Sequence, residues 1–269
     1  MTINQLQIMA KQARGLLLKT AFFAKSGHIG SALSTVDIIT ALYFKWLKIS
    51  PKKPLDKTRD YFILSKGHGC LGLYSVLALR GFFSQNHLET YFQDNTVLTG
   101  HPVINSLPGI EASTGSLGHG FPTAVGLAYG LKNQNMPNRV VVMVSDGECD
   151  EGSTWEAVLS APNFKLNNLT VIVDYNKIQS FGTVKEVMNL EPFAEKWRAF
   201  GWNVLEVNGH NLKQILQALN RAKNYKTGPS VIIAHTIKGK GVDFMESTVD
   251  WHYFNMNEEQ FKQAIQQCE

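Results

Sequence analysis

Two apolar runs with polar ends decide the fold: VVVMVSDGE at residues 140–148 and TVIVDYN at residues 170–176. Before its polar end, each run is almost continuously apolar and rich in Val and Ile, which is typical of strands buried on both faces of a parallel sheet. Residues 153–165, with apolar positions at helical spacing, separate the two runs. This strand–helix–strand order predicts a doubly wound α/β fold, with a mainly parallel sheet and helices on both faces.

The same alternation of strands and helices extends along most of the chain. Strands are expected at Tyr61–Leu64, Val140–Val144, Thr170–Val173, Asn203–Val207 and Val231–Ala234. Helices are expected at residues 3–25, 35–47, 69–80, 120–133, 153–165, 191–199 and 211–223. No internal repeat or low-complexity linker divides the sequence. Since 269 residues with 44% hydrophobic content suffice for one α/β core, we expect a single domain over residues 1–269.

Charge, cysteine content and hydropathy narrow the classes of function. Charged residues make up 18% of the chain, the net charge is +4, and the basic residues are scattered, so we expect no nucleic-acid or membrane partner. Cys70, Cys149 and Cys268 are odd in number and show no CxxC spacing, which agrees with a reducing compartment. Lys19 interrupts the apolar patch near the N-terminus and no cleavage pattern follows, which argues against a signal peptide. A soluble cytoplasmic protein is expected.

Polar side chains follow two neighbouring strands of the expected sheet. Asp146 and Asn176 lie in the polar ends of the two runs, and ligands of doubly wound folds bind beyond such carboxyl ends of strands. A carboxylate, an amide and a following backbone carbonyl can give Mg²⁺ three oxygen ligands, with a diphosphate in the remaining positions. Gly147 would let the backbone approach phosphates closely, and a helix beginning near Ser153 would present the positive end of its dipole nearby. Taken separately, an Asp-Gly turn and an Asn turn explain the same residues.

Histidines are concentrated in glycine-rich loops. His87 and His210 are expected at the surface, and His235, at a strand end, is expected to be structural. Loop histidines beside Gly-X-Gly patterns indicate a backbone cleared for a ligand. Four of the eight lie in such loops: His28, His68, His101 and His119.

Seven short runs, in this order along the chain, resemble the N-terminal domain of transketolases. They are SGHIGS (26–31), SKGHG (65–69), GHP (100–102), TGSLGHG (114–120), DGE through EGSTWEA (146–157), DYNK (174–177), and TIKGKG with Trp-His (236–241 and 251–252). The resemblance covers residues 14–253, and it implies a thiamine-diphosphate-binding fold.

The resemblance also implies roles for individual residues. Implied ligands of Mg²⁺, or of Ca²⁺ or Mn²⁺, are Asp146, Asn176 and the carbonyl of Ile178. Implied contacts of the cofactor diphosphate are His68, Gly147, Lys238 and His252, with Ser31 as another cofactor contact. Implied neighbours of the aminopyrimidine and thiazolium rings are Gly115, Ser116 and Leu117. Implied catalytic residues are His28, His101 and His252, and an imidazole suits proton exchange because its ordinary pKa lies near neutral pH.

Two acids and two departures from the family pattern remain open. Glu151 and Glu156 match acids at the subunit interface of the family, but Ser153 and Glu156 also form the pattern of a helix capping box. Ser145 stands where a Gly is usual, and His119 stands where a Gln is usual; neither receives a role.

The resemblance further implies a missing component. In transketolases the pyrimidine ring meets a glutamate from a separate pyrimidine-binding domain, and the few residues after Trp251 and His252 cannot hold that domain or a C-terminal domain. We therefore expect a split enzyme, a heterotetramer inactive without its partner chain, which supplies the glutamate. It would transfer a two-carbon ketol unit from a ketose phosphate to an aldose acceptor, in the manner of pentose phosphate metabolism.

Four alternatives stay open. The first is the α subunit of a 2-oxo acid dehydrogenase, and the second is a chain similar to deoxyxylulose phosphate synthase. The third is a non-catalytic phosphate or nucleotide binder, although the chain has no GxxxxGK[ST] sequence and no GxGxxG after its first strand. The fourth is a degenerate half-enzyme kept for regulation.

Overall fold

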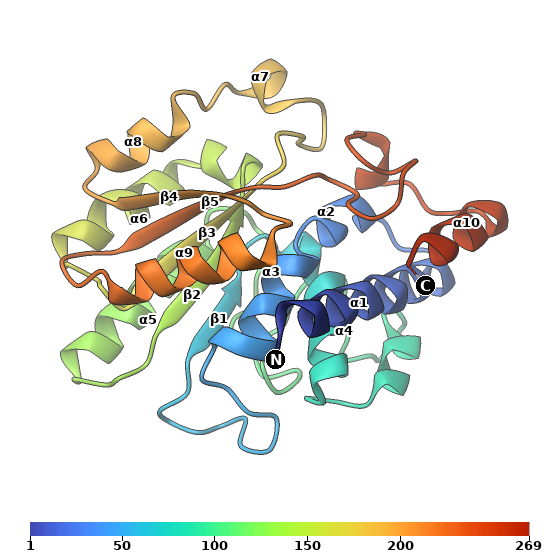
Figure 1. The fold of residues 1–269 in the computed structure, drawn as a ribbon, viewed down its shortest axis with the longest axis horizontal. Helices are drawn as coiled ribbons and strands as arrows, with labels where there is room; N and C mark the ends of the chain where they lie inside the picture. Colours follow the sequence, from blue (N-terminus) through green and yellow to red (C-terminus); the bar gives the residue numbers. More distant parts are fainter. Residues whose placement is uncertain (269) are drawn as a thin grey trace.

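The computed structural model, which describes residues 1–268, is built around a parallel five-stranded sheet (Figure 1). The strands are β1 (Tyr61–Leu64), β2 (Val140–Ser145), β3 (Leu169–Tyr175), β4 (Asn203–Asn208) and β5 (Ser230–His235). Their order in the sheet is β1-β2-β3-β5-β4, and every neighbouring pair is parallel. The expected doubly wound α/β fold and all five expected strands are confirmed.

Helices cover both faces of the sheet (Figure 1). One face packs against α1 (Ile3–Ala24), α3 (Val36–Ala41), α4 (Cys70–Arg80) and α9 (Leu212–Asn224). The other face packs against α5 (Gly120–Asn133), α6 (Gly152–Asn163) and α8 (Phe193–Ala199). Within β2, Val141 and Met143 belong to the first core and Val142 and Val144 to the second. The strand is therefore apolar at every position because both of its faces are buried.

Shorter elements complete the chain. They are α2 (Ile29–Leu33), α7 (Val184–Val187), α10 (Glu258–Cys268), a π turn (Leu42–Trp46) and 3₁₀ turns at Gly67–Gly69, Gln85–Thr90, Gly147–Asp150 and Asp250–His252. The rings of Phe22 and Phe261 stack at 4.2 Å and fasten α10 to α1. Among residues 1–268, no helix combines the length and the apolarity that crossing a bilayer requires.

The helix expectations hold with two corrections. The helix expected at residues 35–47 ends at Ala41, because the backbone widens into the π turn, closed by a hydrogen bond from Leu47 N to Leu42 O. The expected capping box is absent: Ser153 Oγ donates to Gly118 O at 2.7 Å instead, and α6 begins at Gly152 without a side-chain cap. Glu156 is left exposed on α6.

Candidate active site

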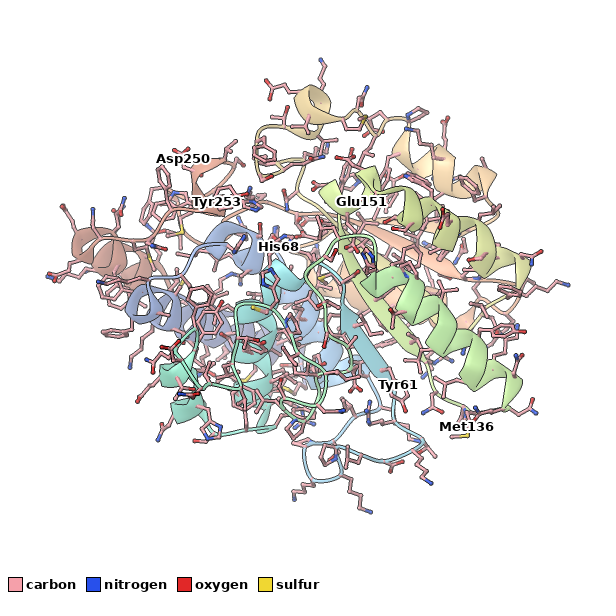
Figure 2. All side chains as sticks on the ribbon, turned by 180° about the vertical axis from the view of Figure 1, so that it is seen from behind. Tyr61, His68, Met136, Glu151, Asp250 and Tyr253 are labelled. Carbon is pink, nitrogen blue, oxygen red and sulfur yellow. The ribbon has the colours of Figure 1, made fainter. Side chains whose placement is uncertain are left out.

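A cavity of about 390 Å³ opens at the carboxyl ends of the strands. In Figure 2, His68, Glu151 and Tyr253 lie in the upper half of the view, and Tyr61, which begins β1, lies in the lower half with Met136. Twelve of the fifteen residues given a site or interface role from the sequence line this cavity: His28, Ser31, His68, His101, Gly115, Leu117, Asp146, Gly147, Glu151, Asn176, Ile178 and His252.

Three of the predicted residues lie outside the lining. Ser116 and Glu156 are exposed, whereas Lys238 is fully buried beneath His252, with Nζ 3.1 Å from His252 Nδ1. His119, which received no role, is exposed as well and lies outside the lining, and its ring nitrogen Nδ1 lies 3.1 Å from Leu117 O.

Four imidazoles meet in the cavity from four separate segments of the chain. The ring centroid of His28 lies 5.6 Å from that of His68, 6.2 Å from that of His101 and 5.1 Å from that of His252. His28 has a left-handed backbone conformation with φ of 63°, which directs the chain into α2. The carbonyl of His252 accepts from His28 N at 2.7 Å and ties the two segments together.

Burial keeps these imidazoles neutral. Desolvation, with the neighbouring His101, Lys66 and Lys238, lowers the pKa of His28 to about 4. Desolvation and the Lys238 ammonium lower the pKa of His252 to about 3. A neutral imidazole presents one donor and one acceptor nitrogen, so the cluster can bind hydroxyl groups and exchange protons with them.

The lowered pKa of His28 predicts acid sensitivity. Below pH 6.5 this imidazole becomes protonated in the unfolded chain, whereas in the folded chain it stays neutral down to about pH 4. The free energy of unfolding should therefore fall as the pH is lowered from 6.5 to 4. His28→Asn, which tolerates the left-handed backbone, should remove about 1–2 kcal/mol of this loss, a value reduced because the side chain is partly screened by solvent. Urea unfolding of the full chain at pH 7, 5.5 and 4.5 measures it, with exposed His87→Asn as control. Equal acid loss in both variants contradicts the prediction.

Asp146 and Asn176 lie side by side at the ends of β2 and β3. Ser145 pairs with Asp174 in the sheet, which places the residues that follow both strands next to each other. Asp146 accepts from Gly147 N at 2.8 Å and from Lys177 N at 2.7 Å, and Asn176 Oδ1 accepts from Ile178 N at 3.0 Å. Desolvation and the charge of Asp174 raise the pKa of Asp146 to about 6. A cation in the cavity would relieve both effects.

The donor set fits a hard cation that carries a diphosphate. Within residues 1–268, no cluster of three or more His, Cys, Asp or Glu side chains forms a closed metal site. One carboxylate, one amide and the Ile178 carbonyl leave coordination positions open, as Mg²⁺ bound to phosphate oxygens requires. At Gly147 an added Cβ would come no closer than 3.4 Å to Gln179, so this backbone is open to the cavity.

The Lys238 ammonium, buried beneath His252, also suits an anionic ligand. Lys238 Nζ donates to Gln179 O at 2.9 Å and lies 3.4 Å from Ile178 O. In the described part of the chain, no carboxylate lies within salt-bridge distance of this ammonium. Burial and the nearby Lys66 lower the pKa of Lys238 to about 8. A buried ammonium held only by neutral groups would gain from a bound diphosphate.

Gly115 is required by its conformation. Its φ of +145° lies in the region that side chains rarely adopt, and an added Cβ would lie 2.6 Å from His101 Cδ2. This glycine therefore lets the loop of Leu117 pass directly beside His101.

Comparison with known proteins settles the family. A family model described as "Transketolase, thiamine diphosphate binding domain" matches residues 5–268. The chain belongs to the transketolase family. It is 39% identical over 99% of its length to an apulose-4-phosphate transketolase subunit from Phocaeicola vulgatus, covering 95% of that protein. It is 41% identical to the 6-deoxy-6-sulfo-D-fructose transketolase subunit SqwG of a Clostridium species, with 98% and 96% of the two chains covered.

Solved transketolases share the fold. The crystal structure of transketolase from Campylobacter jejuni superimposes with a TM-score of 0.93 at 35% identity. The match covers all of this chain and 43% of the Campylobacter chain. The present chain therefore spans less than half of that transketolase.

Sequence reasoning missed three buried polar residues of this transketolase site. Lys66, which lines the cavity, and Asp174 form an ion pair of 2.5 Å with fully buried side chains. Glu148 Oε1 accepts from Ser65 Oγ and from Gly118 N, and burial raises the pKa of Glu148 to about 7. All three lie in the quoted runs, but nothing in a local pattern shows that side chains from different runs pair.

Ser145 does have a structural role. Its Oγ accepts from Glu148 N at 3.1 Å and so closes the turn that follows β2. The hydroxyl therefore supports the backbone at Asp146 and Gly147.

Proposed function

We propose that this chain is the diphosphate- and metal-binding subunit of a two-subunit transketolase that transfers a two-carbon ketol unit from a ketose phosphate to an aldose acceptor. The observation that carries the proposal is the convergence of Asp146, Asn176 and four neutral imidazoles on one cavity at the carboxyl ends of the strands. Two relatives named as subunits of transketolases are covered almost completely by the match, which supports the split arrangement.

All cofactor residues of the proposal except Lys238 and Ser116 line the cavity. Asp146, Asn176 and the carbonyl of Ile178 hold Mg²⁺, or Ca²⁺ or Mn²⁺ in its place. The diphosphate is bound by His68, Gly147, Lys238 and His252, with Ser31 as a further contact, and the rings face Gly115, Ser116 and Leu117. When bound, thiamine diphosphate supplies the electron sink for breaking and forming a carbon–carbon bond next to a carbonyl.

Proton transfer is assigned to the histidines. His28, His101 and His252 present neutral imidazoles to the open part of the cavity, where each can hydrogen-bond a sugar hydroxyl and take up or return its proton. Because Lys66 is paired with Asp174 and Lys238 lies beneath His252, neither is free at the mouth to bind a distant sugar phosphate. Binding of the sugar phosphate is therefore assigned to the partner chain.

The partner completes the site. It supplies the pyrimidine-binding domain, its glutamate and the C-terminal domain, and the pair forms a cytoplasmic heterotetramer. Residues 1–269 form one thiamine-diphosphate-binding domain in this arrangement. Glu151 and Glu156 are exposed and so available at the interface between the chains.

The test compares the chain alone with the reconstituted pair. Copurification from the native source identifies the partner, and ketol transfer from xylulose 5-phosphate should be at least about a hundredfold faster with it than without it. Pyruvate as donor separates the 2-oxo acid dehydrogenase and deoxyxylulose phosphate synthase alternatives. Calorimetry should show binding of thiamine diphosphate with Mg²⁺ and none of ATP with Mg²⁺. Equal activity without the partner, or ATP binding alone, would refute the proposal.

A further inference from the structure

His210, expected at the surface, lies largely buried in a polar network that the proposed chemistry does not use. Its side chain is 11% exposed. Nδ1 lies 2.8 Å from Asp37 Oδ2, and Ile237 N donates to Nε2 at 2.8 Å. Because Nε2 accepts a hydrogen bond from a backbone N–H, the proton of the neutral ring is on Nδ1 and is donated to Asp37.

Asp37 is fixed from its other side by Arg14. The guanidinium makes two hydrogen bonds to the carboxylate, of 3.2 Å and 2.6 Å, in the paired geometry that arginine prefers. Arg14 Nε also donates to Lys240 O at 3.0 Å. Arg14, Asp37 and His210 come from α1, α3 and the loop before α9, so three elements contribute to one network.

The network grips the loop after β5 on both sides of Lys238. His210 holds the N–H of Ile237, one residue before Lys238, and Arg14 holds the carbonyl of Lys240, two residues after it. The Lys238 carbonyl itself accepts from Ser247 N at 2.9 Å. The Lys238 ammonium lies beneath His252 and must reach the cavity from there. The direction of its side chain therefore depends on the position of this loop.

We infer that His210 is a positioning residue: oriented by Asp37 and Arg14, it fixes the backbone at Ile237 and thereby places the Lys238 ammonium for the cofactor diphosphate. The inference rests on the proposed function for the ligand, but the contact it depends on belongs to the chain without ligand.

Two variants distinguish the two hydrogen bonds of His210, one to Asp37 and one from Ile237 N. In His210→Asn, the short amide can still donate to Asp37 but cannot reach Ile237 N. In His210→Gln, the longer side chain places an accepting oxygen near the position of Nε2. If the loop contact is what matters, His210→Asn should weaken Mg²⁺-dependent binding of inorganic pyrophosphate to the full chain roughly tenfold, as expected for one lost hydrogen bond. His210→Gln should stay within about threefold of wild type.

A double-variant cycle tests whether the effect passes through Lys238. In a Lys238→Met background, His210→Asn should cause no further loss of pyrophosphate affinity. An equal tenfold loss in both backgrounds, or equal losses for the Asn and Gln variants, would overturn the inference. His235→Asn is the matched control, because His235 also pairs with a carboxylate, Glu206, at a strand end but is 41% exposed.

Amide hydrogen exchange provides a readout that needs no ligand. In the full chain, the Ile237 amide should exchange roughly tenfold faster in His210→Asn than in wild type or His210→Gln, while amides within β5 keep their rates. An unchanged Ile237 rate would overturn the inference even if pyrophosphate fails to bind. Failure of the wild-type chain to bind pyrophosphate, with exchange as expected, would instead count against the proposed function.

Discussion

Replacing Asp146 with Asn should abolish Mg²⁺-dependent binding of thiamine diphosphate and lower ketol transfer by the reconstituted pair on the order of a thousandfold. A metal ion that neutralises phosphate charge is worth several kcal/mol, and the amide retains the shape of the side chain but not its charge. Asp174, the nearby alternative carboxylate, cannot substitute because Lys66 pairs with it. Calorimetric titration with and without Mg²⁺ and a coupled assay measure the two effects.

The control for Asp146 comes from the same turn. Asp150 carries an equal charge four residues further on; it also lines the cavity, but it is exposed, is assigned no metal contact, and accepts from Gln179 Nε2 at 2.8 Å. Asp150→Asn should change activity by no more than about threefold, as expected for an exposed charge. If Asp146→Asn bound the Mg²⁺ complex as tightly as wild type, the metal site would have to lie elsewhere in the cavity.

Lys66→Met should destabilise the chain by roughly 3–5 kcal/mol, the usual result of leaving one partner of a buried ion pair alone. The 2.5 Å pair with Asp174 has no exposed side-chain surface on either residue. Burial alone would raise the pKa of Asp174, but Lys66 and hydrogen bonds from Ser34 and Thr236 hold it below its ordinary value. Removing the ammonium therefore leaves the carboxylate of Asp174 buried without a charged partner. Urea unfolding of the full chain gives the change in free energy.

Two further variants keep this result interpretable. Adding Asp174→Asn to Lys66→Met removes the stranded charge and should restore at least half of the lost stability, even if the single variant fails to fold. Lys240→Met breaks the partly exposed pair with Glu246, whose side chains are 32% and 28% exposed, and should cost less than about 1 kcal/mol. A loss for Lys66→Met no larger than that for Lys240→Met would show that the buried pair has no special weight.

The backbone was largely predictable from the sequence, because its signals are local. The run at residues 140–148 shows both faces buried, and β2 ends at Ser145, one residue beyond the expected strand. The loop histidines at 28, 68 and 101 were found through their glycine neighbours. His119 carries the same local pattern but lies outside the cavity, since a loop pattern does not give the direction of a side chain.

Contacts between distant segments were not predictable. Lys66 and Asp174 are 108 positions apart, and His210 and Asp37 are 173 positions apart, so no spacing rule links them. His210, between Gly209 and Asn211, has the polar surroundings of a surface turn, and only the position of α3 shows that it is enclosed. The capping box at Ser153 could not be judged from the sequence for the same reason. The Ser153 hydroxyl donates a hydrogen bond to Gly118 O, which belongs to another loop.

The wide separation of the cavity residues along the chain has a consequence for biosynthesis. A ribosome releases Ser31 early, whereas Lys238 and His252 emerge only after the last strand of the sheet. A nascent chain that has already paired β2 with β3 still lacks the ammonium and the imidazole that the proposal assigns to the diphosphate. If the proposed diphosphate contacts are right, the cofactor binds only chains whose last strand has paired, and the free energy of binding stabilises only those completed molecules.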